Sequence, residues 1–170
     1  MAKNTYHVCY ICIINNKYMH TEEKYYIEFT ICFFINKMIN VMKNIKIILV
    51  DKNSIFLNIM KSFFENVLRC KIIGIATNGE AFNTMKNLDK ADIIFMDIEM
   101  SGLNGFHSAI QIFEKLPEAK IIAVSMYNNP YMQNQLMNLG FKGFISKTRF
   151  YYEVIPAIKK VLQNEVYVAN

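Results

Sequence analysis

The sequence Asp-Ile-Ile-Phe-Met-Asp at residues 92–97 places four consecutive apolar side chains directly before a carboxylate. An apolar run of this length is typical of a strand that is buried on both faces of a parallel sheet. Ile45–Val50 is a second apolar stretch, interrupted only by Lys46, and is followed by Asp51. The two stretches predict central strands that each deliver an aspartate to the carboxyl edge of one sheet.

Strands and helices are predicted to alternate over the rest of residues 42–170. The predicted strands are Ile45–Val50, Lys71–Ala76, Asp92–Met96, Ala119–Val124 and Gly143–Ser146. Apolar residues at helical spacing follow each strand, which predicts five helices. This alternation predicts an α/β fold with a five-stranded, doubly wound parallel sheet that helices cover on both faces.

Three sequence signals indicate where helices begin or end. Asn53 or Ser54 is expected to cap the first helix. The second helix is expected over Glu80–Leu88. Pro156 is expected near the start of the last helix, where a missing N–H group costs little.

The composition favours a globular protein that does not read nucleic acid. Of the 170 residues, 53% are hydrophobic and 19% are charged, which is too apolar for a disordered chain. The net charge is +5, but Arg69 and Arg149 are the only arginines and no basic run is present. We therefore expect lysines on solvated helix surfaces and no DNA contact by this chain. No stretch before residue 42 approaches the ~20 apolar residues of a spanning helix, so no membrane segment is expected.

The cysteines predict no metal site. Cys9 and Cys12 have the C-x-x-C spacing, but a second ligand pair at suitable spacing is missing, so a zinc site is not expected. Cys70 stands where a core strand begins, which favours a reduced, buried thiol in a cytosolic protein.

Residues 1–41 differ in composition from the rest of the chain. They contain no Gly, Pro or Asp, the residues that normally form turns in a folded module. Tyr6–Ile14 and Tyr25–Ile35 are β-prone and can pair as a hairpin, which is marginal on its own. Our hypothesis is that 1–41 is an extension outside the functional chain, which then starts at Met42.

Four chemically active side chains follow the predicted strands at their carboxyl ends. Asp51, Asp97, Ser125 and Lys147 end strands one, three, four and five. Ligands of open parallel sheets bind at this edge. A carboxylate beside a cation can attack phosphorus, carboxylates hold Mg²⁺, and a hydroxyl and an ammonium can bind phosphoryl oxygens. The set predicts phosphoryl chemistry at one edge of the sheet.

The sequence at these strand ends resembles a known family. Ile-Ile-Phe-Met-Asp-Ile-Glu-Met-Ser-Gly-Leu-Asn-Gly at 93–105 is similar to the phosphoacceptor segment of bacterial response-regulator receivers. Asp51, Ser125 and Lys147 stand where that family has an acidic residue, a Ser or Thr and a lysine. Gly74 and the Asn-Gly-Glu at 78–80 match receivers of LuxR-type transcription regulators. The resemblance covers 42–170 and implies a flavodoxin-like (CheY-like) strand order, 2-1-3-4-5.

The resemblance also implies a mechanism and site residues. Asp97 would take a phosphoryl group from a histidine kinase or phosphotransfer protein, with Mg²⁺ held by Asp51, Asp97 and the backbone carbonyl of Glu99. Ser125 and Lys147 would contact the phosphate, and the aromatic side chain of Phe144 would rotate inward.

The change would then remodel the surface of helix four, strand five and helix five for a downstream protein target or a homodimer partner. The resemblance implies a cytoplasmic signalling protein of a bacterial two-component phosphorelay rather than an enzyme. A plain core role for Phe144 is the alternative. A small phosphohydrolase with Asp97 as nucleophile is a weaker alternative, since the sequence shows no cap domain or second acid cluster.

The sequence departs from the family at Lys52. Receivers carry a second acidic residue there, which binds the metal, and an ammonium cannot. Magnesium binding is therefore expected to be weakened or absent. Lys52 can instead form a salt bridge with Asp97, or point into solvent. The domain can thus be a phospho-acceptor, a degenerate receiver that binds partners without phosphorylation, or the receiver part of a longer DNA-binding regulator.

Overall fold

The computed structural model describes residues 42–100 and 105–168, and within them a single parallel sheet. The hairpin predicted within 1–41 and Cys9 and Cys12 lie outside the described residues. The strands are β1 (Lys46–Val50), β2 (Lys71–Ala76), β3 (Ile93–Asp97), β4 (Ile121–Ser125), β5 (Gly143–Ser146) and β6 (Tyr167–Val168). Each agrees with its prediction to within two residues, except β6, which was not predicted.

The strand order is β2-β1-β3-β4-β5-β6, with all neighbours parallel. The flavodoxin-like order implied by the resemblance is confirmed for the first five strands. The sixth strand pairs Tyr167 with Gly143 and Val168 with Phe144. The expected five-stranded sheet is therefore one strand short, because a strand of two residues shows no periodicity in the sequence.

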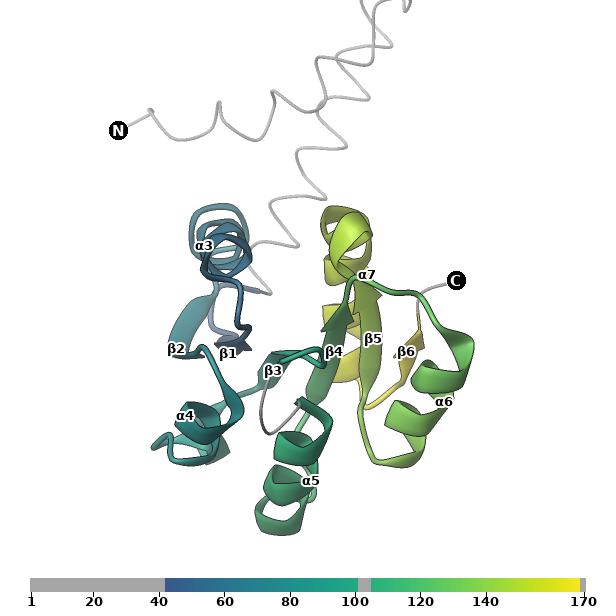
Figure 1. Cartoon of the computed structure of the whole chain (residues 1–170). Coiled ribbons are helices and arrows are strands. Elements are labelled where there is room, and N and C mark those ends of the chain that lie inside the picture. Colours follow the sequence, from purple (N-terminus) through teal and green to yellow (C-terminus); the bar gives the residue numbers. More distant parts are fainter. Residues whose placement is uncertain (1–41, 101–104, 169–170) are drawn as a thin grey trace, which may run out of the picture.

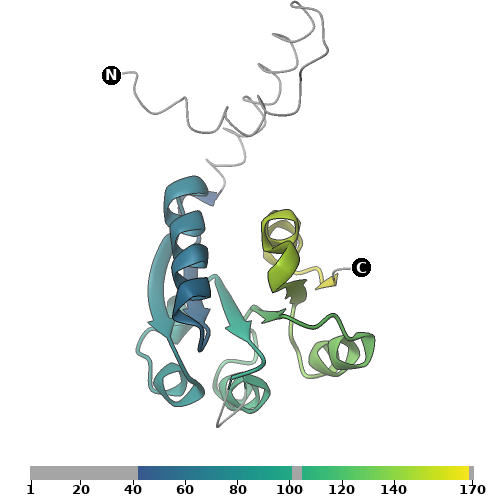
Figure 2. The ribbon, with the colours of Figure 1, turned by 45° about the horizontal axis from the view of Figure 1, so that its top comes forward.

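Helices cover both faces of the sheet, as predicted. They are α3 (Ser54–Ser62), continued by the π-helical turn η1 (Phe63–Val67), α4 (Gly79–Asn83), α5 (Gly105–Lys115), α6 (Pro130–Asn138) and α7 (Phe150–Leu162), with short 3₁₀ turns η2 (Leu88–Lys90) and η3 (Lys147–Arg149). Figures 1 and 2 show α3 and α7 on one face, and α4, α5 and α6 on the other. Among the described residues, no helix combines the length and apolar character that crossing a membrane requires.

Asparagine side chains start three of these helices. The side chain of Asn53 accepts hydrogen bonds from the N–H groups of Ile55 and Phe56, at 3.0 and 3.2 Å. Asn78 and Asn129 cap α4 and α6 in the same way. Each cap satisfies N–H groups that have no partner within the helix, which fixes where the chain leaves the carboxyl edge of the sheet.

Two helix predictions are wrong. The second helix ends at Asn83 rather than Leu88, because the hydroxyl of Thr84 donates to the carbonyl of Glu80 and Asn87 adopts a left-handed φ of 65°. Pro156 lies in the middle of α7, since that helix already begins at Phe150. The carbonyl of Tyr152 loses a helical hydrogen bond to the proline, and Tyr152 is 82% exposed, so water can replace it.

The two faces of the sheet have separate apolar cores. Under α3 and α7 the core is aromatic, with the ring of Phe64 centred 4.9 Å from that of Phe95 and 5.9 Å from that of Phe150. Cys70 belongs to this core as a free thiol, and burial raises the pKa of the thiol to about 11. The buried, reduced thiol predicted for Cys70 is confirmed.

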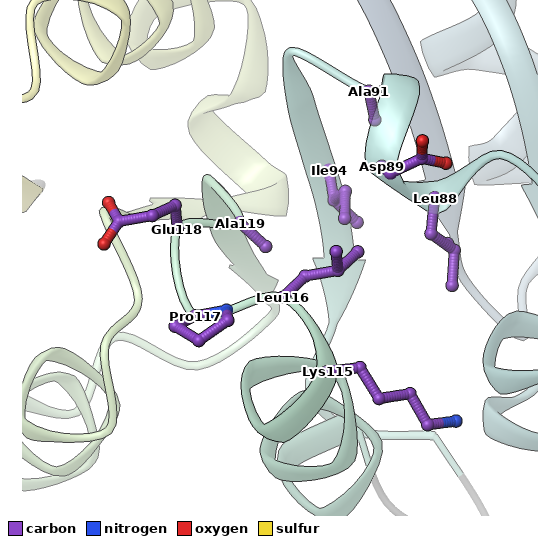
Figure 3. A pocket seen from close by; sticks show the side chains of 9 residues that line it. All are labelled: Leu88, Asp89, Ala91, Ile94, Lys115, Leu116, Pro117, Glu118 and Ala119. Atoms are coloured by element: carbon purple, nitrogen blue, oxygen red, sulfur yellow. The ribbon is translucent and has the colours of Figure 1, made fainter.

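A pocket of about 330 Å³ lies at the amino ends of β3 and β4 (Figure 3). Its lining residues are Leu88, Asp89, Ala91, Ile94, Lys115, Leu116, Pro117, Glu118 and Ala119. None of these is a predicted site residue, so this pocket and the strand-end cluster are separate features.

Candidate functional site

The parallel sheet brings the predicted strand-end residues to one edge. Asp97 and Ser125 are the last residues of β3 and β4, whereas Asp51 and Lys147 directly follow β1 and β5. Asp97 is paired in register with Val124, the residue before Ser125. Four separate elements thus deliver the two carboxylates, the hydroxyl and the ammonium, as the sequence predicts.

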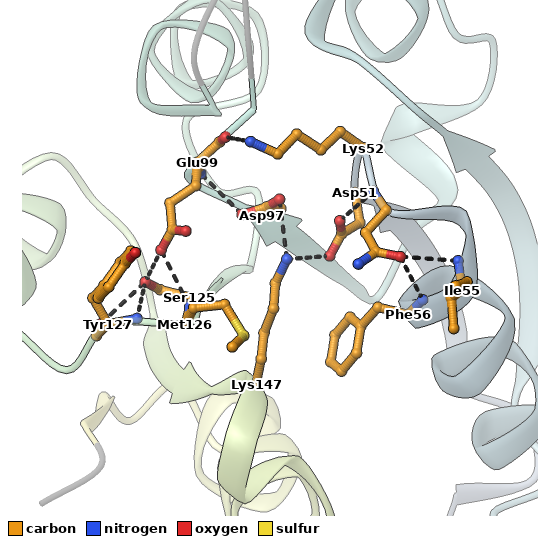
Figure 4. A network of polar contacts seen from close by, with 11 residues as sticks. Asp51, Lys52, Ile55, Phe56, Asp97, Glu99, Ser125, Met126, Tyr127 and Lys147 are labelled. Carbon is orange, nitrogen blue, oxygen red and sulfur yellow. Dashed lines mark hydrogen bonds and ion pairs between the residues drawn. The ribbon is translucent and has the colours of Figure 1, made fainter.

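Lys147 holds both aspartates at the base of the site (Figure 4). Its Nζ lies 2.7 Å from Oδ2 of Asp51 and 3.0 Å from Oδ2 of Asp97. The two carboxylates are 0% exposed and the lysine side chain is 8% exposed. We call Asp51, Asp97 and Lys147 the floor of the site. Each floor carboxylate depends on the same ammonium for its charge compensation.

The second oxygen of each aspartate accepts a backbone hydrogen bond. Oδ1 of Asp51 accepts from the N–H of Asn53 at 2.8 Å, and Oδ1 of Asp97 accepts from the N–H of Glu99 at 2.9 Å. Burial raises the pKa of Asp51 above its ordinary value of 3.8, although the contacts with Lys147 and Asn53 act in the opposite direction. The negative charge of Asp97 adds to the increase in that pKa. In the floor, two buried carboxylates therefore repel each other while both are attracted to one ammonium.

The side chain of Glu99 accepts hydrogen bonds from donors at the carboxyl end of β4. Its Oε1 accepts hydrogen bonds from Oγ of Ser125 and, at 3.1 Å, from the N–H of Met126. Oγ of Ser125 also accepts from the N–H of Tyr127 at 3.0 Å. The sequence assigns a metal-binding role to the backbone carbonyl of Glu99 but predicts no contact between its side chain and Ser125. The side-chain contact was missed because it joins residues 26 positions apart.

Lys52 adopts neither of the two arrangements considered from the sequence. Its Nζ donates to the backbone carbonyl of Glu99 at 2.5 Å, as Figure 4 shows. Within the described residues it forms no ion pair with Asp97, and its ammonium is not directed only at solvent. We call Lys52, Glu99 and Ser125 the rim of the site. The rim lysine reaches across from the loop after β1 to the loop after β3.

The donor set as arranged does not fit a divalent cation. The implied ligands are two carboxylates that share the ammonium of Lys147 and a carbonyl that accepts from the ammonium of Lys52. Magnesium requires octahedral oxygen coordination, and a nearby ammonium repels it and competes for the same oxygens. The described part of the chain also has no group of three or more His, Cys, Asp or Glu side chains that could hold a metal.

The sequence that carries this site matches the model of a known family. The model of the response regulator receiver domain matches residues 47–159, which include all of the floor and the rim. The chain belongs to the response regulator receiver family. It is thus a receiver domain of the two-component type, and the predicted family is confirmed.

Two curated relatives of this receiver are response regulators. UvrY of Escherichia coli (strain K12) is 25% identical over 126 residues, and GacA of Pseudomonas aeruginosa is 22% identical over 125 residues. Each alignment covers 74% of this chain but 58% of the relative. The chain therefore spans little more than half the length of these regulators.

Solved receivers have the same fold. The non-phosphorylated receiver domain of the stress response regulator RcsB from Escherichia coli superposes with a TM-score of 0.66 at 21% identity, covering 75% of this chain and 99% of that one. A two-component response regulator of the LuxR family from Aurantimonas sp. SI85-9A1 gives 0.67 at 20% identity, covering 72% and 87%. The resemblance to LuxR-type receivers predicted from the sequence agrees with these matches.

Phe144 of this receiver is buried in the core. It is 0% exposed on β5, opposite Ala123 of β4, in the cluster under α4, α5 and α6. The resemblance expects this aromatic to turn inward on phosphorylation. In the structure its side chain lies inside, as that of a plain core residue would.

Proposed function

We propose that this receiver accepts a phosphoryl group on Asp97 from a histidine kinase or a phosphotransfer protein. The observation that carries the proposal is the buried Asp97 carboxylate at the end of β3, with Lys147 Nζ 3.0 Å away and Ser125 on the neighbouring strand. An oxygen of Asp97 would attack the phosphorus of a phosphohistidine, the P–N bond would break, and the imidazole would leave with the electron pair and take up a proton.

The chain's own donors can stabilise the acyl phosphate that forms. Lys147 would pass from the Asp97 carboxylate to a phosphoryl oxygen, because the added group carries about −2 charge. The hydroxyl of Ser125 and the N–H of Met126 are donors of the kind that phosphoryl oxygens accept from. Both now bind the carboxylate of Glu99, which would have to move aside.

The signal would pass through the surface of α6, β5 and α7 to a downstream protein target. Tyr131 on α6 and Tyr152 on α7 are 72% and 82% exposed, and exposed tyrosines are favoured at protein interfaces. A homodimer through the same surface is compatible with this role. The sequence has no basic run, which supports protein partners and no DNA contact by this chain. We further propose that it acts in the cytoplasm and as a signalling domain rather than an enzyme.

Magnesium binding would be weakened or absent in this receiver. Lys52 replaces an acidic ligand of the family, and its ammonium occupies the carbonyl of Glu99, which the family resemblance assigns to the metal. Losing one ligand and placing a positive charge beside the others both act against a divalent ion.

A degenerate receiver that binds its partner without phosphorylation is the second candidate function. Two observations favour it: Phe144 is already buried, and Lys52 already links the loops after β1 and β3. The relatives are longer than this chain, so a receiver within a longer DNA-binding regulator is a compatible setting for either function.

Reaction with acetyl phosphate separates the two functions. The protein is incubated with acetyl phosphate in millimolar Mg²⁺, and intact-mass spectrometry measures the mass increase of one phosphoryl group, with Asp97→Asn as the control. A modified wild type beside an unmodified Asp97→Asn supports the phospho-acceptor. An unmodified wild type, with a folded spectrum by circular dichroism, would overturn it in favour of the degenerate receiver.

A further inference from the structure

We propose that the ammonium of Lys52 supplies the positive charge that a divalent metal would otherwise bring, so that a phosphoryl-type anion binds at Asp97 without a metal ion. The inference rests on the proposed phospho-acceptor function and deepens it. It concerns what neutralises the acceptor site rather than which residue accepts.

The ammonium of Lys52 is linked to Asp97 through Glu99. Nζ of Lys52 lies on the carbonyl of Glu99, whose N–H in turn donates to Oδ1 of Asp97 at 2.9 Å. Residue 99 therefore connects the cation to the acceptor carboxylate. Figure 4 shows the lysine side chain extended from beside Asp51 toward this carbonyl, to which Asp97 is linked through Glu99. A cation held there faces an anion that joins Asp97.

The site has more carboxylates than ammonium groups in its floor. Asp51 and Asp97 share the single ammonium of Lys147. Glu99 places a third carboxylate beside them, on Ser125 and Met126. A phosphoryl group would add further negative charge to this set. Lys52 is the second lysine that contacts the site, and without it or a metal ion the excess charge would oppose the adduct.

Lys52 has N–H donors beyond the one that binds the Glu99 carbonyl. An ammonium has three N–H donors, and the Glu99 carbonyl accepts from one of them. Lys52 is exposed at the rim, so it can turn a second donor to an incoming oxygen without being drawn out of a buried pair. Its backbone is fixed between Asp51 and Asn53, whose N–H binds the Asp51 carboxylate. The cation is thus tethered, and no ion has to be captured from solution.

Beryllofluoride, a phosphoryl mimic that adds to carboxylates, provides the test. Its adduct with the full chain is measured by ¹⁹F NMR in metal-depleted buffer and in millimolar Mg²⁺. The variants are Lys52→Met, which removes the charge, and Lys52→Asp, which restores an acidic pair. Lys90→Met removes a charge from an exposed lysine in η2, at the other end of the sheet, and serves as the matched control. Asp97→Asn identifies the adduct, and circular dichroism confirms that each variant is folded.

We expect the wild type and Lys90→Met to form the adduct equally with and without Mg²⁺. Without metal, Lys52→Met should bind about tenfold more weakly, the size of effect expected for a lost charge-assisted contact. Lys52→Asp should form the adduct only with Mg²⁺. A wild type that needs Mg²⁺, or a Lys52→Met that binds as the wild type does without metal, would overturn the inference and leave Asp97 as the acceptor. No wild-type adduct in either buffer would overturn the proposed function as well.

Discussion

The lysine of the floor and the lysine of the rim lie in opposite surroundings. In the floor, Lys147 is 8% exposed and binds two carboxylates that are 0% exposed. In the rim, Lys52 is exposed and binds a neutral carbonyl. Removing the cation from a buried ion pair strongly lowers the free energy of unfolding, whereas removing an exposed cation changes it little. The comparison indicates that the floor is part of the stability of the fold, while the rim can vary and tune the chemistry.

Removing the floor cation should have the largest effect. Lys147→Met leaves Asp51 and Asp97 buried without their shared partner, and we expect the free energy of unfolding to fall by about 3 kcal/mol at pH 7. Urea denaturation followed by circular dichroism measures it. Lys52→Met is the matched rim variant and should change stability by less than ~1 kcal/mol. Equal losses in the two variants would show that the distinction between floor and rim is false.

Removing a floor carboxylate should instead raise the free energy of unfolding. The pKa of Asp51 is raised in the folded state, so its contribution to stability is present at low pH and is lost as the pH rises through the folded-state pKa. Asp51→Asn removes this loss, and we expect the free energy of unfolding to rise by an amount on the order of 1 kcal/mol at pH 7. The gain should shrink as the pH falls through the raised folded-state pKa and should be absent below the ordinary value of 3.8. Midpoints of urea denaturation across this pH range test the prediction. An Asp51→Asn variant that is less stable than the wild type at pH 7 would contradict it.

Neutralising the rim carboxylate should affect binding more than stability. Glu99→Gln weakens the competing negative charge on Ser125 and Met126. We expect beryllofluoride to bind about threefold more tightly, with stability changed by less than ~0.5 kcal/mol. ¹⁹F NMR titration gives the affinity. Weaker binding would mean that Glu99 supports the anion instead of competing with it.

Chemical labelling compares the accessibility of Lys52 and Lys147 without a mutation. Brief acetylation of the native protein should modify Lys52 and spare Lys147, because only the first is exposed. Peptide mass spectrometry gives the extent at each position, and labelling in urea should make the two equal. Similar labelling of both in the native state would indicate that the floor opens readily.

The floor was predictable from the sequence, and the contacts of the rim were not. Apolar runs ending at Asp51 and Asp97 predict strands, and parallel strands necessarily bring their carboxyl ends together. Lys52 was recognisable as a departure from the family. Its contact with the Glu99 carbonyl spans 47 positions and depends on the paths of two loops, which no local pattern encodes. The early end of α4 was missed for a similar reason, since the hydroxyl of Thr84 competes with the helix.

The short strand β6 has a consequence for how the molecule meets other chains. By pairing with Gly143 and Phe144, it takes up backbone groups that would otherwise lie open along the border of the sheet. Unpaired strand borders invite edge-to-edge association and aggregation. Another polypeptide that extended the sheet on this side would have to displace residues 167–168 or pair with a strand of only two residues, and a strand that short is a poor template for association.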